Sequence, residues 1–68
     1  MINSQLIGER IKEAREKNNL SQRALADKLA VSQPAIVQWE KGYKIPNTMM
    51  MNALADVLDV TTDYLNGR

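Results

Sequence analysis

The stretch that decides the fold is QRALADKLAVSQPAIVQW, residues 22–39. Its apolar residues recur at helical spacing in two short runs. The first run is Leu25, Ala26 and Leu29, and the second is Ala35, Ile36 and Trp39. A serine precedes each helical segment, at Ser21 and Ser32, and serine caps a helix by accepting a hydrogen bond from a free backbone N–H group. We therefore expect two short helices, from residue 22 to about 29 and from residue 33 to about 41.

The residues between and beyond the two runs indicate how the helices are joined. Residues 30–32 form the turn, and Pro34 falls in the first turn of the second helix, where its missing N–H group costs nothing. Gly42 ends that helix. Two short capped helices that meet at a tight turn form a helix-turn-helix, which we place at about residues 21–40. The second helix is the one we expect to carry the function.

The flanking segments predict further helices at residues 4–18 and 48–58. Their apolar stripes are Ile7, Ile11 and Ala14 in the first segment, and Met51, Leu54, Ala55 and Leu58 in the second. Asn47 is the expected cap of the second segment, and Thr61 caps a last helical turn that ends near Leu65. The chain has no strand-like alternation, low-complexity segment or internal repeat. We therefore expect a compact all-α domain of five helices.

With 68 residues, the chain is long enough for one small domain and no more, so we treat residues 1–68 as a single domain. It contains no cysteine and no histidine, which argues against disulfides, a transition-metal site and the commonest general base. We expect no metal, no cofactor, no small-molecule substrate and no enzymatic activity. No apolar run approaches the ~18 residues of a membrane span, and no signal-peptide pattern opens the chain.

The net charge of +1 is unevenly distributed along the chain. Residues 1–45 hold eight Lys or Arg and five acidic residues, a net charge of +3, whereas residues 46–68 hold one Arg and three Asp, a net charge of −2. A basic part that contains the helix-turn-helix is typical of a phosphate-binding face. An ordinary solvated surface of mixed charge fits the same numbers.

Three consecutive methionines, residues 49–51, cannot all face the core. Met51 belongs to the apolar stripe, so we expect Met49 and Met50 to be partly exposed. Exposed methionines can serve a contact with another protein, although singly exposed apolar residues are also ordinary.

Four segments, in order and in register, resemble the lambdoid phage repressor and Cro-like helix-turn-helix domains. They are IGERIKEAREKNNLSQRALADKL (residues 7–29), VSQPAIVQWEKG (31–42), IPN (45–47) and LADVLDVTTDYL (54–65). Together they cover nearly the whole chain, from about Leu6 to Leu65. The resemblance implies a compact five-helix fold of the lambda-repressor type. It also implies a transcriptional regulator that binds double-stranded DNA sequence-specifically. Of the kinds of regulator, the resemblance favours a repressor.

The family pattern of the motif has glutamine at the head of its first helix and a small alanine four residues on, here Gln22 and Ala26. Its apolar positions fall on Leu25, Val31, Ile36 and Trp39. One position departs from the pattern. The family usually has glycine, in a left-handed conformation, at the first turn position, and this chain has Ala30. Alanine in that conformation costs on the order of 1 kcal/mol.

The resemblance places the second helix of the motif in the major groove of an operator half-site, with base-reading positions at Gln33, Pro34 and Gln38. A glutamine amide can pair bidentately with N6 and N7 of adenine, and we expect Gln38 about one turn after Gln33 on the same side. Pro34 and Val37 have no side-chain hydrogen-bonding groups, so they would contact only thymine methyl groups or sugars. Outside such a motif, both glutamines would be ordinary solvated surface residues.

Phosphate contacts would position the protein on the duplex and supply salt-dependent affinity. The expected phosphate-binding residues are Ser21, Gln22, Arg23, Lys41, Lys44, Arg15 and Asn47. By resemblance, Arg15 also pairs with Glu40 and ties the first helix to the reading helix. The alternative is two unrelated surface charges, whose pairing is worth ~0–1 kcal/mol. We favour the pair because an unpaired Glu40 beside the reading surface would repel DNA.

The resemblance also implies a homodimer on two half-sites about one helical turn apart, with a contact through Val60–Leu65. Thr62 falls where a relative can carry an apolar residue. Because a polar residue weakens such a contact, both a weak dimer and a monomer in solution are compatible with the sequence. We expect a cytoplasmic protein of a bacterium or phage-infected cell, associated with the nucleoid. The alternative function is a protein-interaction module of the antitoxin or adaptor kind, which the low net charge and exposed Met49 and Met50 would support.

Overall fold

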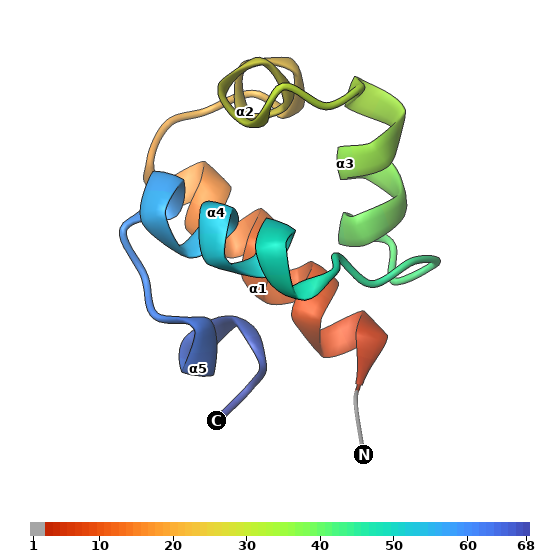
Figure 1. Cartoon of the computed structure of the whole chain (residues 1–68), viewed down its shortest axis with the longest axis vertical. Helices are drawn as coiled ribbons and strands as arrows, with labels where there is room; N and C mark the ends of the chain where they lie inside the picture. Colours follow the sequence, from red (N-terminus) through yellow and green to blue (C-terminus); the bar gives the residue numbers. More distant parts are fainter. Residues whose placement is uncertain (1–2) are drawn as a thin grey trace.

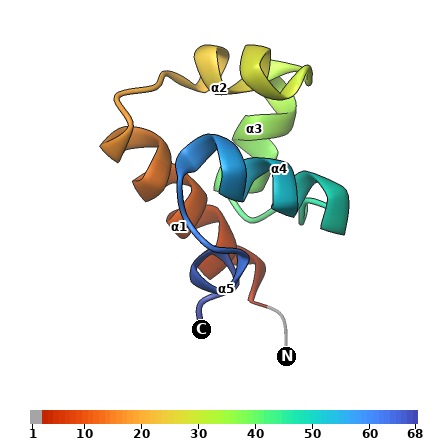
Figure 2. The same ribbon diagram turned by 60° about the vertical axis from the view of Figure 1, so that its left-hand side comes forward.

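The computed structural model describes residues 3–68, and in that range it contains five helices and no strand. The helices are α1 (Ser4–Lys17), α2 (Gln22–Leu29), α3 (Gln33–Glu40), α4 (Thr48–Leu58) and α5 (Thr62–Leu65). The prediction of an all-α fold with five helices is confirmed. In Figures 1 and 2, α2 and α3 lie together at one end of the molecule, and α5 lies at the opposite end beside the start of α1.

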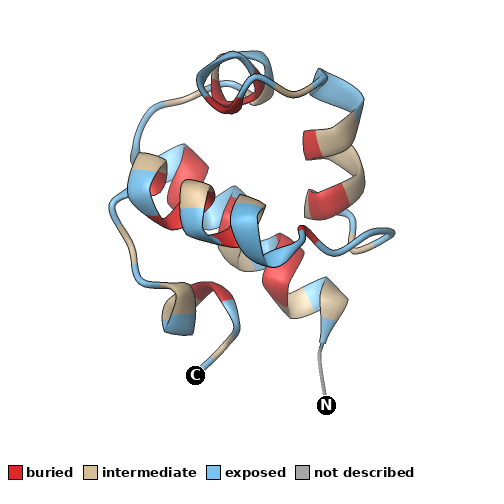
Figure 3. Ribbon diagram, in the orientation of Figure 1, coloured by how far each residue is buried: buried red, intermediate tan, exposed pale blue. Residues whose placement is uncertain are grey.

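The core receives at least one fully buried side chain from every helix. These side chains are Ile11 from α1, Leu25 from α2, Ile36 from α3, Leu54 and Leu58 from α4, and Leu65 from α5. Figure 3 shows the buried positions turned toward the centre of the molecule on all five helices. The apolar stripes predicted for the helices therefore meet in one core, which fixes the orientation of α3 relative to the others.

A capping side chain precedes each helix. The side-chain oxygens of Asn3, Ser21, Ser32, Asn47 and Thr61 each accept a hydrogen bond from the backbone N–H three residues later, at 2.8–3.3 Å. Four of these caps follow the sequence prediction, and Asn3 adds the cap of α1. Because each cap satisfies an N–H group that has no partner inside its helix, the helix starts are set by single residues.

The five helices also end in the same way. The first or second residue after each helix has a left-handed conformation, with φ between 56° and 82°. These residues are Asn19, Ala30, Gly42, Asp59 and Gly67. The N–H group of the next residue then bonds the carbonyl five residues earlier, as from Val31 to Ala26 at 3.0 Å and from Tyr43 to Gln38 at 2.9 Å. This is the Schellman motif, and it confirms the left-handed conformation expected for Ala30.

The expectation that the chain lacks an internal repeat is wrong. LADKLAVSQPAI (residues 25–36) and LADVLDVTTDYL (residues 54–65) share five identical residues, and both form a helix, a left-handed turn residue, a half-buried valine and a capped second helix. The turn angles agree closely, with φ 56° and ψ 41° at Ala30 and φ 57° and ψ 47° at Asp59. The repeat is hidden in the sequence because the residues after the turn differ.

The methionine triplet divides as predicted. Met51 is buried, Met49 is 70% exposed, and Met50 is half-buried and packs against the core. No helix within residues 3–68 combines the length and the apolar character needed to cross a membrane.

Candidate nucleic-acid interface

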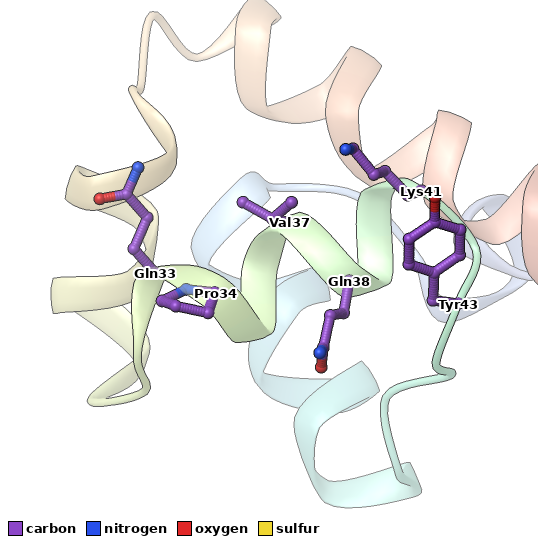
Figure 4. Close-up of a pocket in the computed structure, with 6 residues that line it drawn as sticks. All are labelled: Gln33, Pro34, Val37, Gln38, Lys41 and Tyr43. Atoms are coloured by element: carbon purple, nitrogen blue, oxygen red, sulfur yellow. The ribbon is translucent and has the colours of Figure 1, made fainter.

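The outward face of α3 is a shallow concave surface of about 490 Å³. It is lined by Gln33, Pro34, Val37, Gln38, Lys41 and Tyr43. Gln33 and Pro34 are exposed at the beginning of the helix, immediately after the Ser32 cap, and Val37 and Gln38 are half-buried. Figure 4 shows these side chains along one face of α3 and the loop that follows it. The structure therefore brings the three predicted base-reading residues onto one accessible surface.

The two glutamines do not point the same way, which corrects their expected placement. Five residues separate Gln33 from Gln38, and at 3.6 residues per turn this spacing rotates the second side chain by about 140°. Figure 4 shows them extending to different sides of the face, with Pro34 and Val37 between them. The concave surface thus has a polar group at each edge and an apolar centre.

The far end of α3 rests on α1 through a very close backbone contact. A Cβ atom at Gly8 would collide with the backbone carbonyl oxygens of Trp39 and Glu40. Gly8 is buried inside α1, so only the absence of a side chain lets the two helices approach this closely. This contact positions α3, and helical periodicity alone did not identify it.

A buried ion pair joins α1 to α3 at the same end. Arg15 Nε donates to Glu40 Oε2 at 2.6 Å and Arg15 Nη2 to Glu40 Oε1 at 3.1 Å. Arg15 Nη1 also donates to the carbonyl of Leu20 at 2.8 Å, and Gln22 Nε2 donates to Glu40 Oε1 at 3.1 Å. Because the two charged side chains are only 10% and 4% exposed, this contact differs from an ordinary surface pair.

The hydrogen bond to Glu40 raises the pKa of Arg15 above its ordinary value, against the opposing effect of burial. A basic group with a raised pKa stabilises the fold below its unfolded-state pKa and loses that effect only as the pH rises through the folded-state value. Arg15 therefore stays charged throughout the neutral range. With each of its three side-chain nitrogens donating a hydrogen bond and its side chain buried, Arg15 is the least accessible of the residues expected to bind phosphate.

The remaining expected phosphate-binding residues differ in how free their side chains are. Arg23, Lys41 and Lys44 are exposed cations around α2 and α3. Ser21 and Asn47 are exposed helix caps whose side-chain oxygens accept backbone N–H groups, while the hydroxyl hydrogen of Ser21 and the Nδ2 group of Asn47 can still donate. Gln22 is half-buried and engaged with Glu40.

Tyr43 also belongs to this surface, although no motif in the sequence pointed to it. It is 75% exposed and lines the concave surface with Gln38 and Lys41. The Lys41 ammonium lies 6.0 Å from the centre of its ring. No sequence pattern predicts this position, because it depends on how the chain turns at Gly42. Among residues 3–68, no three His, Cys, Asp or Glu side chains gather as a possible metal site.

The sequence of this chain is similar to the sequences of known transcription regulators. The chain is 42% identical over 64 residues to repressor protein C2 of Salmonella phage P22, covering 94% of this chain and 30% of that protein. It is 36% identical over 62 residues to the HTH-type transcriptional regulator ImmR of Bacillus subtilis, covering 91% of this chain and 49% of ImmR. The chain thus spans less than half the length of these two curated relatives.

Two solved structures match a similar share of this chain. The crystal structure of the P22 c2 repressor protein in complex with synthetic operator 9T has a TM-score of 0.84 and 43% identity, covering 90% of this chain and 92% of that one. SinR, described as the master regulator for biofilm formation and solved in complex with DNA, has a TM-score of 0.80 and 30% identity, covering 87% of this chain and 95% of that one. The pattern of the family described as "Helix-turn-helix" matches residues 11–65, and the chain belongs to that family.

Proposed function

We propose that this chain is a sequence-specific DNA-binding domain of a transcriptional regulator, and that it acts as a repressor. The observation that supports this most directly is the exposed first turn of α3, where Gln33 and Pro34 project from a helix anchored firmly at its other end. A helix with its side chains is about 10–12 Å across, which suits a major groove ~12 Å wide. The described relatives are transcriptional regulators, which supports a binding role over an enzymatic one.

The proposed base contacts follow from the two edges and the apolar centre of the concave surface. Gln33 and Gln38 each offer an amide suited to adenine, and their divergent directions favour two different base pairs. Pro34, with Val37 beside it, offers only apolar surface and so fits a thymine methyl group or a sugar. We therefore expect a half-site containing A·T pairs.

The proposed phosphate contacts come from the rim of the same face. Arg23, Lys41 and Lys44 supply exposed positive charge, and Ser21 and Asn47 supply neutral donors at the starts of α2 and α4. We propose that Gln22 and Arg15 act mainly by holding Glu40, because their side chains are already engaged there. Pairing with Arg15 neutralises a carboxylate that would otherwise repel the DNA backbone.

We further propose that residues 1–68 act as one domain and bind as a two-fold dimer through Val60–Leu65. Leu65 is fully buried, so the available contact surface comes from the residues before it. Thr62 lines a hollow that also includes Ile45, which is 45% exposed. An operator-binding protein of this kind would act at the nucleoid, in the cytoplasm of a bacterium or a phage-infected cell.

Selection of bound fragments from a random pool of duplexes tests the proposed function. We expect two related half-sites about one helical turn apart, with A·T pairs in each. Affinity for the selected duplex should fall steeply with salt, by a slope of about −0.9 for each phosphate neutralised. Absence of duplex binding even at low salt would contradict the proposal.

The alternative is a protein-interaction module, and one observation favours it. Met49 is 70% exposed and Ile45 is 45% exposed, near the start of α4. Met50, however, is half-buried and packs against the core, so among residues 49–51 the exposed surface belongs mainly to Met49. Failure of DNA binding, together with a dependence of partner binding on Met49, would establish this alternative.

A further inference from the structure

Tyr43 differs from the residues that occupy the same place after α1, α2 and α4. In a Schellman motif, the residue after the left-handed position is commonly apolar and packs back against its own helix. Leu20, Val31 and Val60 occupy this place after α1, α2 and α4, and all three are packed against the core. Tyr43 occupies it after α3 and remains 75% exposed. The large ring is therefore presented to solvent rather than used to close the helix end.

The backbone that presents Tyr43 is nevertheless held firmly. Its N–H group donates to the carbonyl of Gln38 at 2.9 Å, and Gly42 before it has a φ of 78°. A side chain at Gly42 would press on the backbone of Gln5 at the start of α1. The position of Tyr43 relative to Gln38 is thus fixed by the turn, while its side chain keeps an open face.

The location of Tyr43 relative to α3 indicates which part of a duplex it would face. When the first turn of α3 enters the major groove, the end of the helix and the following loop lie at the rim, beside the sugar–phosphate backbone. Lys41 projects from that end of α3, close to Tyr43 (Figure 4), and its ammonium lies 6.0 Å from the ring centre. A phenolic O–H donor beside an ammonium group is suited to one phosphate oxygen.

We infer that Tyr43 and Lys41 together bind a single backbone phosphate at the rim of each half-site, with the Tyr43 hydroxyl donating to it. The ring also keeps the Lys41 ammonium at this place through its negative face. The inference rests on the proposed DNA-binding function and adds Tyr43 to it as a positioning contact. Such a contact sets the register of α3 on the duplex without reading sequence.

The direct test measures duplex affinity for Tyr43→Phe, Lys41→Gln and the double variant on the selected duplex. Tyr43→Phe removes only the hydroxyl, so we expect about tenfold weaker binding, equal across base-pair variants of the site. Its salt slope should stay unchanged, because a neutral donor displaces no counterion. Lys41→Gln should reduce the slope by about 0.9 for each half-site bound. The double variant should lose less than the product of the single losses, because both groups share one phosphate.

Methylphosphonate substitution, one phosphate at a time, identifies the partner. We expect one position in each half-site where the neutral linkage weakens the wild-type protein, weakens Tyr43→Phe and Lys41→Gln less, and has little further effect on the double variant. Lys17→Gln, which removes an exposed lysine paired only with Glu13 on α1, is the matched control and should leave this pattern unchanged. Melting temperatures of all variants should match the wild type, since Tyr43 and Lys41 are exposed.

The outcomes separate this inference from the proposed function. If the wild-type protein selects a duplex and Tyr43→Phe binds it equally well, the Tyr43 contact is disproved while the DNA-binding function stands. A Tyr43→Phe loss confined to one base pair would replace the phosphate contact with base reading. If the wild-type protein binds no duplex, the proposed function itself fails, and the phosphate contact fails with it.

Discussion

The two halves of the internal repeat use the same turn for different purposes. The turn after α2 and the turn after α4 have nearly equal backbone angles, a valine against the core and a hydroxyl cap on the next helix. After the first turn, α3 begins with exposed Gln33 and Pro34. After the second, α5 is only four residues long and ends in the fully buried Leu65. The turn therefore determines how two helices meet, and the residues after it determine whether a surface is presented.

The second helix of each repeat, α3 in one and α5 in the other, is also anchored differently. α3 is fixed at its far end by the Arg15–Glu40 pair and by its close approach to Gly8, which leaves its outward face free. α5 is fixed by Leu65 and by Tyr64, whose ring lies 4.6 Å from the guanidinium carbon of Arg10. A reading helix needs an anchor that does not occupy its reading face, and a polar pair at the helix end provides one.

The largest expected effect comes from removing the anchor of α5. Leu65→Ala should lower the free energy of unfolding by about 4 kcal/mol, since it deletes a fully buried side chain and leaves a cavity. Ile36→Ala, at the matching position of the first repeat, should cost a similar amount. Urea unfolding measures both. A loss below about 1 kcal/mol for Leu65→Ala would mean that α5 is not part of the core.

The polar anchor of α3 is tested by Glu40→Gln. This change leaves the Arg15 charge buried without its partner, and we expect a loss of about 3 kcal/mol in the free energy of unfolding at neutral pH. Glu13→Gln is the matched control, because the Glu13–Lys17 pair is exposed on α1 and should contribute below about 0.5 kcal/mol. Equal melting temperatures for Glu40→Gln and the wild type would contradict a structural role for the pair.

The smallest expected effect distinguishes the two turns themselves. Ala30→Gly should raise the free energy of unfolding by about 1 kcal/mol, because alanine is strained in the left-handed conformation. Asp59→Gly should change it by less than about 0.5 kcal/mol, since aspartate tolerates that conformation better. Thermal unfolding of the two variants side by side provides the measurement. A larger gain at Asp59 than at Ala30 would reverse this account of the turns.

Local signals in the sequence predicted most of the fold. Serine, asparagine and threonine caps act within three residues, so the helix starts were predictable from the chain itself. The contacts that join distant segments were not. Asn18 donates to the carbonyl of Leu58 at 2.9 Å, forty residues away, and only the packed core brings these groups together. The accessible face of α3 was predicted, whereas Tyr43 depended on how the chain turns after Gly42.

The central claim is that α3, and not its counterpart α5, reads bases. Gln33 and Thr62 occupy matching positions in the two repeats, so the decisive measurement is duplex selection with Gln33→Ala and Thr62→Ala beside the wild type. We predict that Gln33→Ala loses discrimination at one base pair of each half-site, at a cost of ~1–3 kcal/mol, while Thr62→Ala keeps the wild-type base preference. An unchanged base preference for Gln33→Ala, or a loss spread evenly over all sequences, would contradict the account.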